Sequence, residues 1–111
     1  MVRTQGINSS SLMSINDVAR HLLKTCQTLK FFECFMFGSS LFGVGIDYDI
    51  LVIGPAGEKL IQLKAELKLA GAKLPLDILY MLPKEAEETD FVVKQKCVSL
   101  THLVPLDSMV V

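Results

Sequence analysis

The sequence lacks the features that mark nucleic-acid-binding and membrane proteins. It has no excess of positive charge, because 11 basic residues are balanced by 12 acidic ones and Arg3 and Arg20 are the only arginines. Proteins bind a nucleic-acid backbone mainly through clustered Lys and Arg, so we do not expect nucleic acid as the main partner. No segment approaches the ~20 apolar residues of a membrane-spanning helix, and no basic leader precedes an apolar run. We therefore expect a cytoplasmic protein that does not enter the membrane.

The cysteine pattern also argues against a metal-binding or redox motif. The chain has three cysteines, Cys26, Cys34 and Cys97, and none of them forms a Cys-x-x-Cys pair. All three lie among apolar residues, where a free cysteine behaves as a small hydrophobic side chain. We expect reduced, buried thiols in a reducing compartment.

Length and composition indicate a single domain that contacts a partner. A chain of 111 residues is long enough for one hydrophobic core, and too short for a second, substrate-binding domain. We expect a loose arm over residues 1–12 and one domain over residues 13–111. Half of the residues are hydrophobic and only 21% are charged. This apolar composition predicts that part of the surface is covered by another protein or by a second copy of the chain.

The most informative segment is the run from Phe37 to Ile53, FGSSLFGVGIDYDILVI. It predicts a Gly-Ser turn at Gly38 and Ser39, followed by a strand that carries Asp47 and Asp49. Alternate residues of a strand point to the same side, so both carboxylates can reach one divalent cation. The pattern indicates a metal site.

A third acid lies in the later segment PLDILYM, residues 75–81. The segment is typical of a buried strand, and Asp77 is the one charge within it. A buried carboxylate costs several kcal/mol unless it is paired or bound to a cation. We therefore expect Asp77 to share the metal with the first two acids.

The remaining pattern predicts alternating helices and strands around a small mixed sheet. Apolar residues at helical spacing follow Ser14, which resembles a helix N-cap with Asp17 three residues later. A further helix should end at Gly71, and another should begin with Pro83. For residues 91–103 the periodicity does not decide between helix and strand. By residue number, the expected order is helix 14–30, strand 31–37, turn 38–43, strand 46–53, helix 60–70, strand 74–82 and helix 83–90.

Taken in order, these motifs resemble the DNA polymerase beta-type nucleotidyltransferase superfamily. The likeness extends over residues 31–82 and consists of a strand, a Gly-Ser turn, an Asp-x-Asp strand, a helix and a strand with one Asp. The small size resembles the minimal, antitoxin-type single-domain members. The resemblance implies an α/β (α+β) fold with a small mixed sheet flanked by helices. One difference is that Ser40, Leu41 and Phe42 follow the Gly-Ser pair, where many relatives carry a basic residue.

The resemblance also implies a chemistry and a set of roles. Asp47, Asp49 and Asp77 would be the catalytic and metal-binding residues of a two-metal Mg²⁺ site, while Gly38, Ser39 and Ser40 would bind the nucleotide. The substrate would be ATP or another nucleoside triphosphate, with AMP transferred to a hydroxyl group. Such transfer needs a clamped triphosphate, neutralised charge and an aligned acceptor, which metals held by carboxylates provide.

The same resemblance leaves the partner and the activity open. One interpretation is an enzyme that acts on a protein partner, as the antitoxin of a toxin-antitoxin pair with a helical toxin. A second is a non-catalytic binding module that keeps the fold and neutralises or scaffolds its partner by contact. A third is one subunit of an enzyme that needs a separate substrate-binding subunit. A homo-oligomer is compatible with each of these.

Overall fold

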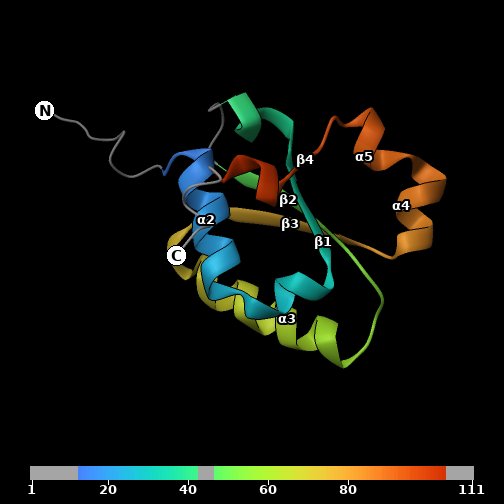
Figure 1. The fold of residues 1–111 in the computed structure, drawn as a ribbon, viewed down its shortest axis with the longest axis horizontal. Helices are drawn as coiled ribbons and strands as arrows, with labels where there is room; N and C mark the ends of the chain where they lie inside the picture. Colours follow the sequence, from blue (N-terminus) through green and yellow to red (C-terminus); the bar gives the residue numbers. More distant parts are fainter. Residues whose placement is uncertain (1–12, 43–46, 105–111) are drawn as a thin grey trace, which may run out of the picture.

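The computed structural model describes residues 13–42 and 47–104, which form a four-stranded mixed sheet and its surrounding helices (Figure 1). The strand order is β3-β2-β1-β4. β2 pairs antiparallel with β1 and parallel with β3, and β4 pairs antiparallel with β1. The strands are β1 Glu33–Phe37, β2 Tyr48–Ile53, β3 Leu76–Met81 and β4 Val98–Ser99. This architecture confirms the expected mixed α/β fold. The expected N-terminal arm lies outside the described residues.

The first helix, α2 (Ile15–Thr25), begins where the sequence predicted. The Ser14 side chain accepts a hydrogen bond from the Asp17 N–H at 3.1 Å, as an N-cap does. The predicted end near residue 30 is wrong, because the helix stops at Thr25 and a 3₁₀ helix, η1 (Gln27–Phe31), follows. Thr28 donates from its N–H (3.0 Å) and hydroxyl (2.8 Å) to the Glu66 carboxylate, a contact from a distant helix that overrides the helical periodicity.

Helix α3 (Glu58–Ala70) forms the crossover between the parallel strands β2 and β3. It ends at Gly71, as predicted, with the Gly71 N–H donating to the Leu67 carbonyl. Helix α4 (Pro83–Thr89) has Pro at its first position, also as predicted. The undecided segment contains a short helix, α5 (Phe91–Lys94), then β4 and the 3₁₀ helix η4 (Leu100–Leu103).

The two sides of the sheet have different surroundings. In Figure 1, α2 and α3 lie on one side of the strands, and α4 and α5 lie on the other. We call the first side the helix-packed face, because its strand residues join α2 and α3 in the main core. We call the second side the acidic face. The helix-packed face carries Cys34, Met36, Tyr48, Ile50, Val52, Leu76, Ile78 and Tyr80, and the acidic face carries Phe35, Phe37, Asp49, Leu51, Ile53, Asp77, Leu79 and Met81.

The helix-packed face holds the fold together. Met36 and Ile50 are completely buried there against Leu22 of α2 and Leu63 of α3. Burying each such side chain contributes about 1.5–3 kcal/mol relative to leaving it exposed. Leu51 and Ile53 are also buried, but they lie on the acidic face and do not join this cluster.

The described residues bear on two further expectations. Within residues 13–42 and 47–104, no helix combines the length and the apolar character needed to cross a membrane. The three cysteines are free thiols. Cys26 and Cys34 are buried, as expected, whereas Cys97 is partly exposed.

Candidate functional site: acids at one end of the sheet

The site begins with two carboxylates on neighbouring strands. Asp49 of β2 and Asp77 of β3 are direct partners in the parallel register. Partners in adjacent strands project from the same side of a sheet, so both side chains lie on the acidic face. The prediction that Asp47 lies on the same strand as Asp49 is wrong, because Asp47 lies in a bend just before β2 and is exposed. Asp49 and Asp77 are therefore partners across two strands, and Asp47 lies two residues before Asp49.

The electrostatics of Asp49 show that the acids act on one another. Partial burial raises the pKa of the Asp49 carboxyl, and the negative charges of Asp77 and Asp47 raise it further. Like charges held close together favour the neutral form of the group between them. A cation bound at this end of the sheet would relieve that repulsion.

Gly38 brings the backbone of the preceding turn against the Asp49 carboxylate. Gly38 has a φ of +75°, in the left-handed region that favours glycine. A Cβ built on Gly38 would lie 2.6 Å from Asp49 Oδ2, closer than real Cβ contacts come. The backbone conformation therefore favours glycine at this position, and a Cβ there would also displace the Asp49 carboxylate.

Ser40 fixes this arrangement from the inside. Its hydroxyl donates to the Phe37 carbonyl at 2.8 Å and accepts from the Asp49 N–H at 3.2 Å. The residue is buried within the 3₁₀ helix η2 (Gly38–Phe42), where the sequence predicted a turn. The Ser40 hydroxyl is thus occupied by two backbone groups, while Ser39 beside it is exposed.

The expectation that Asp77 is a buried charge is wrong. β3 lies at the edge of the sheet among the described strands, and the Asp77 side chain is exposed. The apolar residues around it suggested a central strand, but strand order is a long-range property that the local pattern does not contain. The position of Asp77 opposite Asp49, rather than the cost of burying it, now connects it to a site.

A preformed cluster of metal ligands is not part of the described structure. Among residues 13–42 and 47–104, no group of three or more His, Cys, Asp or Glu side chains is arranged to hold a metal ion. The donor set of Asp49 and Asp77 nevertheless fits Mg²⁺. This ion is commonly bound through one or two carboxylates, with substrate phosphates and water completing its shell.

An aromatic pair beside the acids was missed at the level of sequence. Phe37 is the register partner of Asp49 on the acidic face. The Phe91 ring, at the start of α5, packs edge-on against the Phe37 ring, with centroids 5.2 Å apart and planes at 87°. Phe37 was visible as the residue before the turn, but Phe91 fell in the undecided segment. The pair forms an apolar wall next to Asp49.

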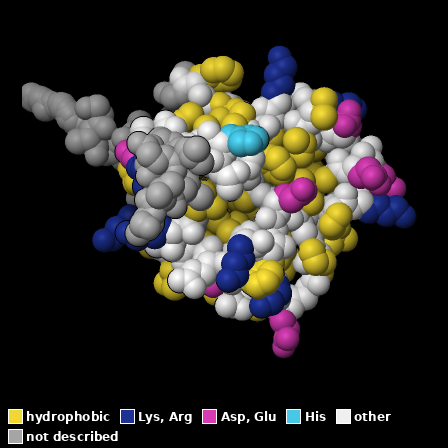
Figure 2. Space-filling model, viewed as in Figure 1, with side chains coloured by type: hydrophobic (Ala, Val, Ile, Leu, Met, Phe, Trp, Pro, Cys, Tyr) yellow, Lys and Arg dark blue, Asp and Glu magenta, His cyan; other side chains and the backbone are white. Residues whose placement is uncertain are grey.

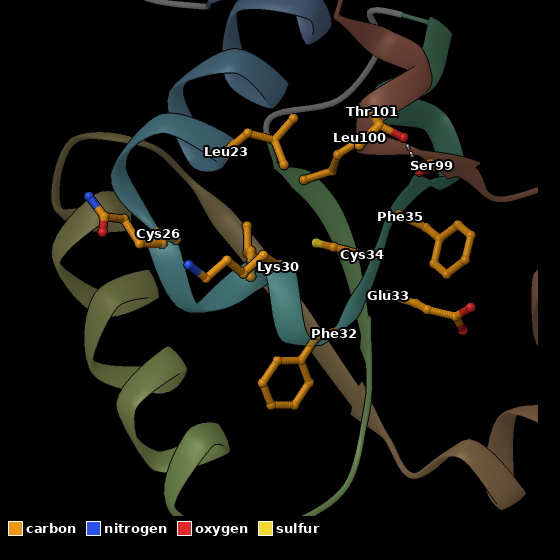
Figure 3. A pocket seen from close by; sticks show the side chains of 12 residues that line it. Leu23, Cys26, Lys30, Phe32, Glu33, Cys34, Phe35, Ser99, Leu100 and Thr101 are labelled. Carbon is orange, nitrogen blue, oxygen red and sulfur yellow. Dashed lines mark hydrogen bonds between the residues drawn. The ribbon is translucent and has the colours of Figure 1, made fainter. Parts of the chain in front are cut away.

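A larger hollow lies away from these acids. It has a volume of about 680 Å³ and opens between η1, β1 and η4, where Figure 3 shows Cys34 and Leu100 facing it. None of the three predicted acids lines it. Burial raises the pKa of the Cys34 thiol to about 12, so this cysteine stays protonated and is a poor nucleophile.

Comparisons of the whole chain with protein-family models, with curated proteins and with solved structures found no match. The interpretation of the site therefore depends on the geometry of its own residues.

Proposed function

We propose that this chain is a Mg²⁺-dependent nucleotidyltransferase that moves AMP from ATP to a hydroxyl of a protein partner or a small molecule. The supporting observation is the position of Asp49. Its carboxylate is beside Asp77 across the sheet and beside Gly38 of the Gly-Ser turn. Nucleotidyl transfer requires acids for a metal and a backbone turn for the phosphates at one place, and this end of the sheet offers both.

Each residue has a defined task in the proposed reaction. Asp47, Asp49 and Asp77 would bind Mg²⁺ with the triphosphate. Exposed Ser39 would contact the phosphates beside Gly38. The acceptor oxygen forms a bond to the α-phosphorus of ATP, and the bond from that phosphorus to the β-phosphate oxygen breaks. Pyrophosphate leaves, and Asp77 takes the hydroxyl proton. Bound Mg²⁺ supplies positive charge that offsets the developing negative charge.

The test uses ATP labelled at the α- or γ-phosphate, with Mg²⁺, the purified chain and a cell extract as a source of acceptors. Label should transfer from the α-position and not from the γ-position, because AMP rather than phosphate moves. Asp49→Asn and Asp77→Asn should each abolish transfer. Glu88→Gln, an equal change of charge at an exposed position of α4, should leave it intact. Transfer from the γ-position, or transfer that survives both site variants, would contradict the proposal.

A second candidate is a non-catalytic binding module that acts on a partner by contact. Several large apolar side chains favour it, since Phe42 is 81% exposed and Leu69 is 79% exposed. Figure 2 shows hydrophobic side chains reaching the surface between charged groups on the face in view. Such surface is typical of a protein-protein contact. If Asp49→Asn and Asp77→Asn leave partner binding and its biological effect unchanged, the binding module is the better description.

A further inference from the structure

The outer edge of β3 carries backbone groups that no described strand pairs. β3 has a single neighbour, β2, within residues 13–42 and 47–104. The Tyr48 N–H donates to the Pro75 carbonyl at 2.8 Å, and the Gly54 N–H donates to the Met81 carbonyl at 3.1 Å. These bonds fix which residues of β3 turn toward β2.

In a parallel pair, alternate residues turn both backbone groups toward the partner strand. Residues 75, 77, 79 and 81 therefore face β2. The N–H and C=O groups of Ile78 and Tyr80 consequently point away from the sheet. Such an edge is a ready template for another strand.

A basic groove runs along this edge on the helix-packed side. It has a volume of about 330 Å³ and lies between α3, which contributes Lys64 and Lys68, and the half-buried β3 residues Leu76, Ile78 and Tyr80. The Lys64 Nζ lies 4.8 Å from the centroid of the Tyr80 ring. Among the described residues, neither lysine forms a salt bridge. The groove thus offers two exposed cations above an edge that none of the described strands pairs.

The spacing of the lysines matches an extended chain. Lys64 and Lys68 are four residues apart on α3, about 6 Å along the helix axis. Alternate residues of a strand are about 6.6 Å apart and point to the same side. Two side chains of an added strand, at positions i and i+2, can therefore each lie near one lysine.

We propose that the edge of β3 binds an extended segment of a partner protein, which adds to the sheet as a fifth strand and carries acidic residues at alternate positions. The acidic residues would lie on the helix-packed side, next to Lys64 and Lys68. The residues between them would lie on the acidic face, where Asp77 disfavours further acids and Leu79 favours apolar side chains. Backbone pairing provides affinity, and the lysines select the sequence.

The charges argue for a foreign segment rather than a second copy of this chain. Antiparallel pairing of two β3 edges would place both α3 helices on one side of the joined sheet, with Lys64 and Lys68 of both copies close together. The only acid in β3, Asp77, would lie on the opposite side and could not offset them. Like charges across such a contact are destabilising.

The proposal is tested by fluorescence polarisation with a labelled eight-residue peptide in which Glu alternates with Val. The matched control peptide has Lys in place of Glu. We expect the Glu peptide to bind and the Lys peptide not to bind. The double variant Lys64→Glu/Lys68→Glu should lose about tenfold or more in affinity for the Glu peptide and gain affinity for the Lys peptide. Lys84→Glu/Lys94→Glu, with the same change of charge on α4 and α5, should retain Glu-peptide binding.

A second measurement separates strand addition from simple charge attraction. Amide hydrogen exchange should slow at Ile78 and Tyr80 when the Glu peptide is bound, because the added strand accepts from those N–H groups. The proposal is overturned if the Glu peptide does not bind or if the charge-reversed groove binds it equally well. Binding without protection of these two amides also overturns it, as does self-association through β3 in sedimentation. The result is independent of the proposed enzymatic activity, because no nucleotide or Mg²⁺ is present.

Discussion

The two faces of β2 differ in what they carry. One packs against helices α2 and α3, and the other carries the acids of the proposed site. On the helix-packed face, Tyr48, Ile50 and Val52 are buried against α2 and α3. On the acidic face, Leu51 and Ile53 are buried as well, but Asp49 at the start of the strand is only half-buried. The faces therefore differ mainly at one end of the sheet, where β2 and β3 begin and the acids lie.

This difference shows how one strand can serve stability and chemistry at the same time. The central position of β2 allows Ile50 and Leu51, adjacent in sequence, to be completely buried on opposite faces. Asp49 belongs to this strand, and its backbone N–H donates to the Ser40 hydroxyl, while its carboxylate lies next to Gly38. A carboxylate on such a support loses little freedom when it binds a ligand, which is what a preorganised site requires.

The largest expected effect comes from opening a cavity on the helix-packed face. Ile50→Ala removes a side chain with 0% exposure and should lower the free energy of unfolding by about 2–5 kcal/mol. On the acidic face of the edge strand β3, Leu79→Ala removes a side chain that is 38% exposed and should cost no more than about 1 kcal/mol. Urea denaturation measures both. Equal losses would show that the acidic face carries as much of the core as the helix-packed face.

An intermediate effect is expected where the turn meets the acidic face. Gly38→Ala should cost about 1–3 kcal/mol, because alanine is strained at positive φ and its Cβ meets the Asp49 carboxylate. In an Asp49→Ala background the contact is absent, so the same substitution should cost less. The difference, measured by a double-mutant cycle in urea, reports the contact itself. A cost that is identical in both backgrounds would mean that only the backbone conformation requires glycine.

Local sequence signals predicted the features that depend on near neighbours. The Ser14 cap, the end of α3 at Gly71 and the first position of α4 at Pro83 each involve bonds or conformations within a few residues. The local pattern likewise placed Asp49 and Asp77 correctly on strands. These predictions needed no knowledge of the strand order.

Features set by distant residues could not be predicted in this way. The early end of α2 depends on Glu66, which lies 38 residues from Thr28. The exposure of Asp77 depends on β3 being an edge strand, and the apolar sequence of β3 gave no sign of that position. The direct pairing of Asp49 with Asp77 depends on register, and alternation within each strand does not determine which residues of two strands are partners.

The smallest effect that we predict concerns the charge of Asp49. Burial and the charges of Asp77 and Asp47 raise its pKa in the folded protein, so ionised Asp49 opposes folding. The pKa of Asp49 is therefore higher in the folded protein than in the unfolded chain. As the pH falls through the folded-state pKa of Asp49, the wild-type protein should gain stability relative to Asp49→Asn. At neutral pH, where Asp49 is ionised, Asp49→Asn should melt at a higher temperature than the wild type in EDTA. Thermal melting from pH 4 to 8 measures the difference.

Magnesium should reverse the order of the two melting temperatures, so that the wild type melts above Asp49→Asn. The reason is that a cation held by Asp49 and Asp77 offsets the repulsion between the acids, which the substitution removes. Mg²⁺ with ATP should raise the melting temperature of the wild type and leave that of Asp49→Asn nearly unchanged. Glu88→Gln controls for the change in net charge and should respond to Mg²⁺ and ATP as the wild type does. If the wild type and Asp49→Asn respond equally, the acidic end of the sheet does not bind the ion. The contrast between the two faces of β2 would then concern packing alone.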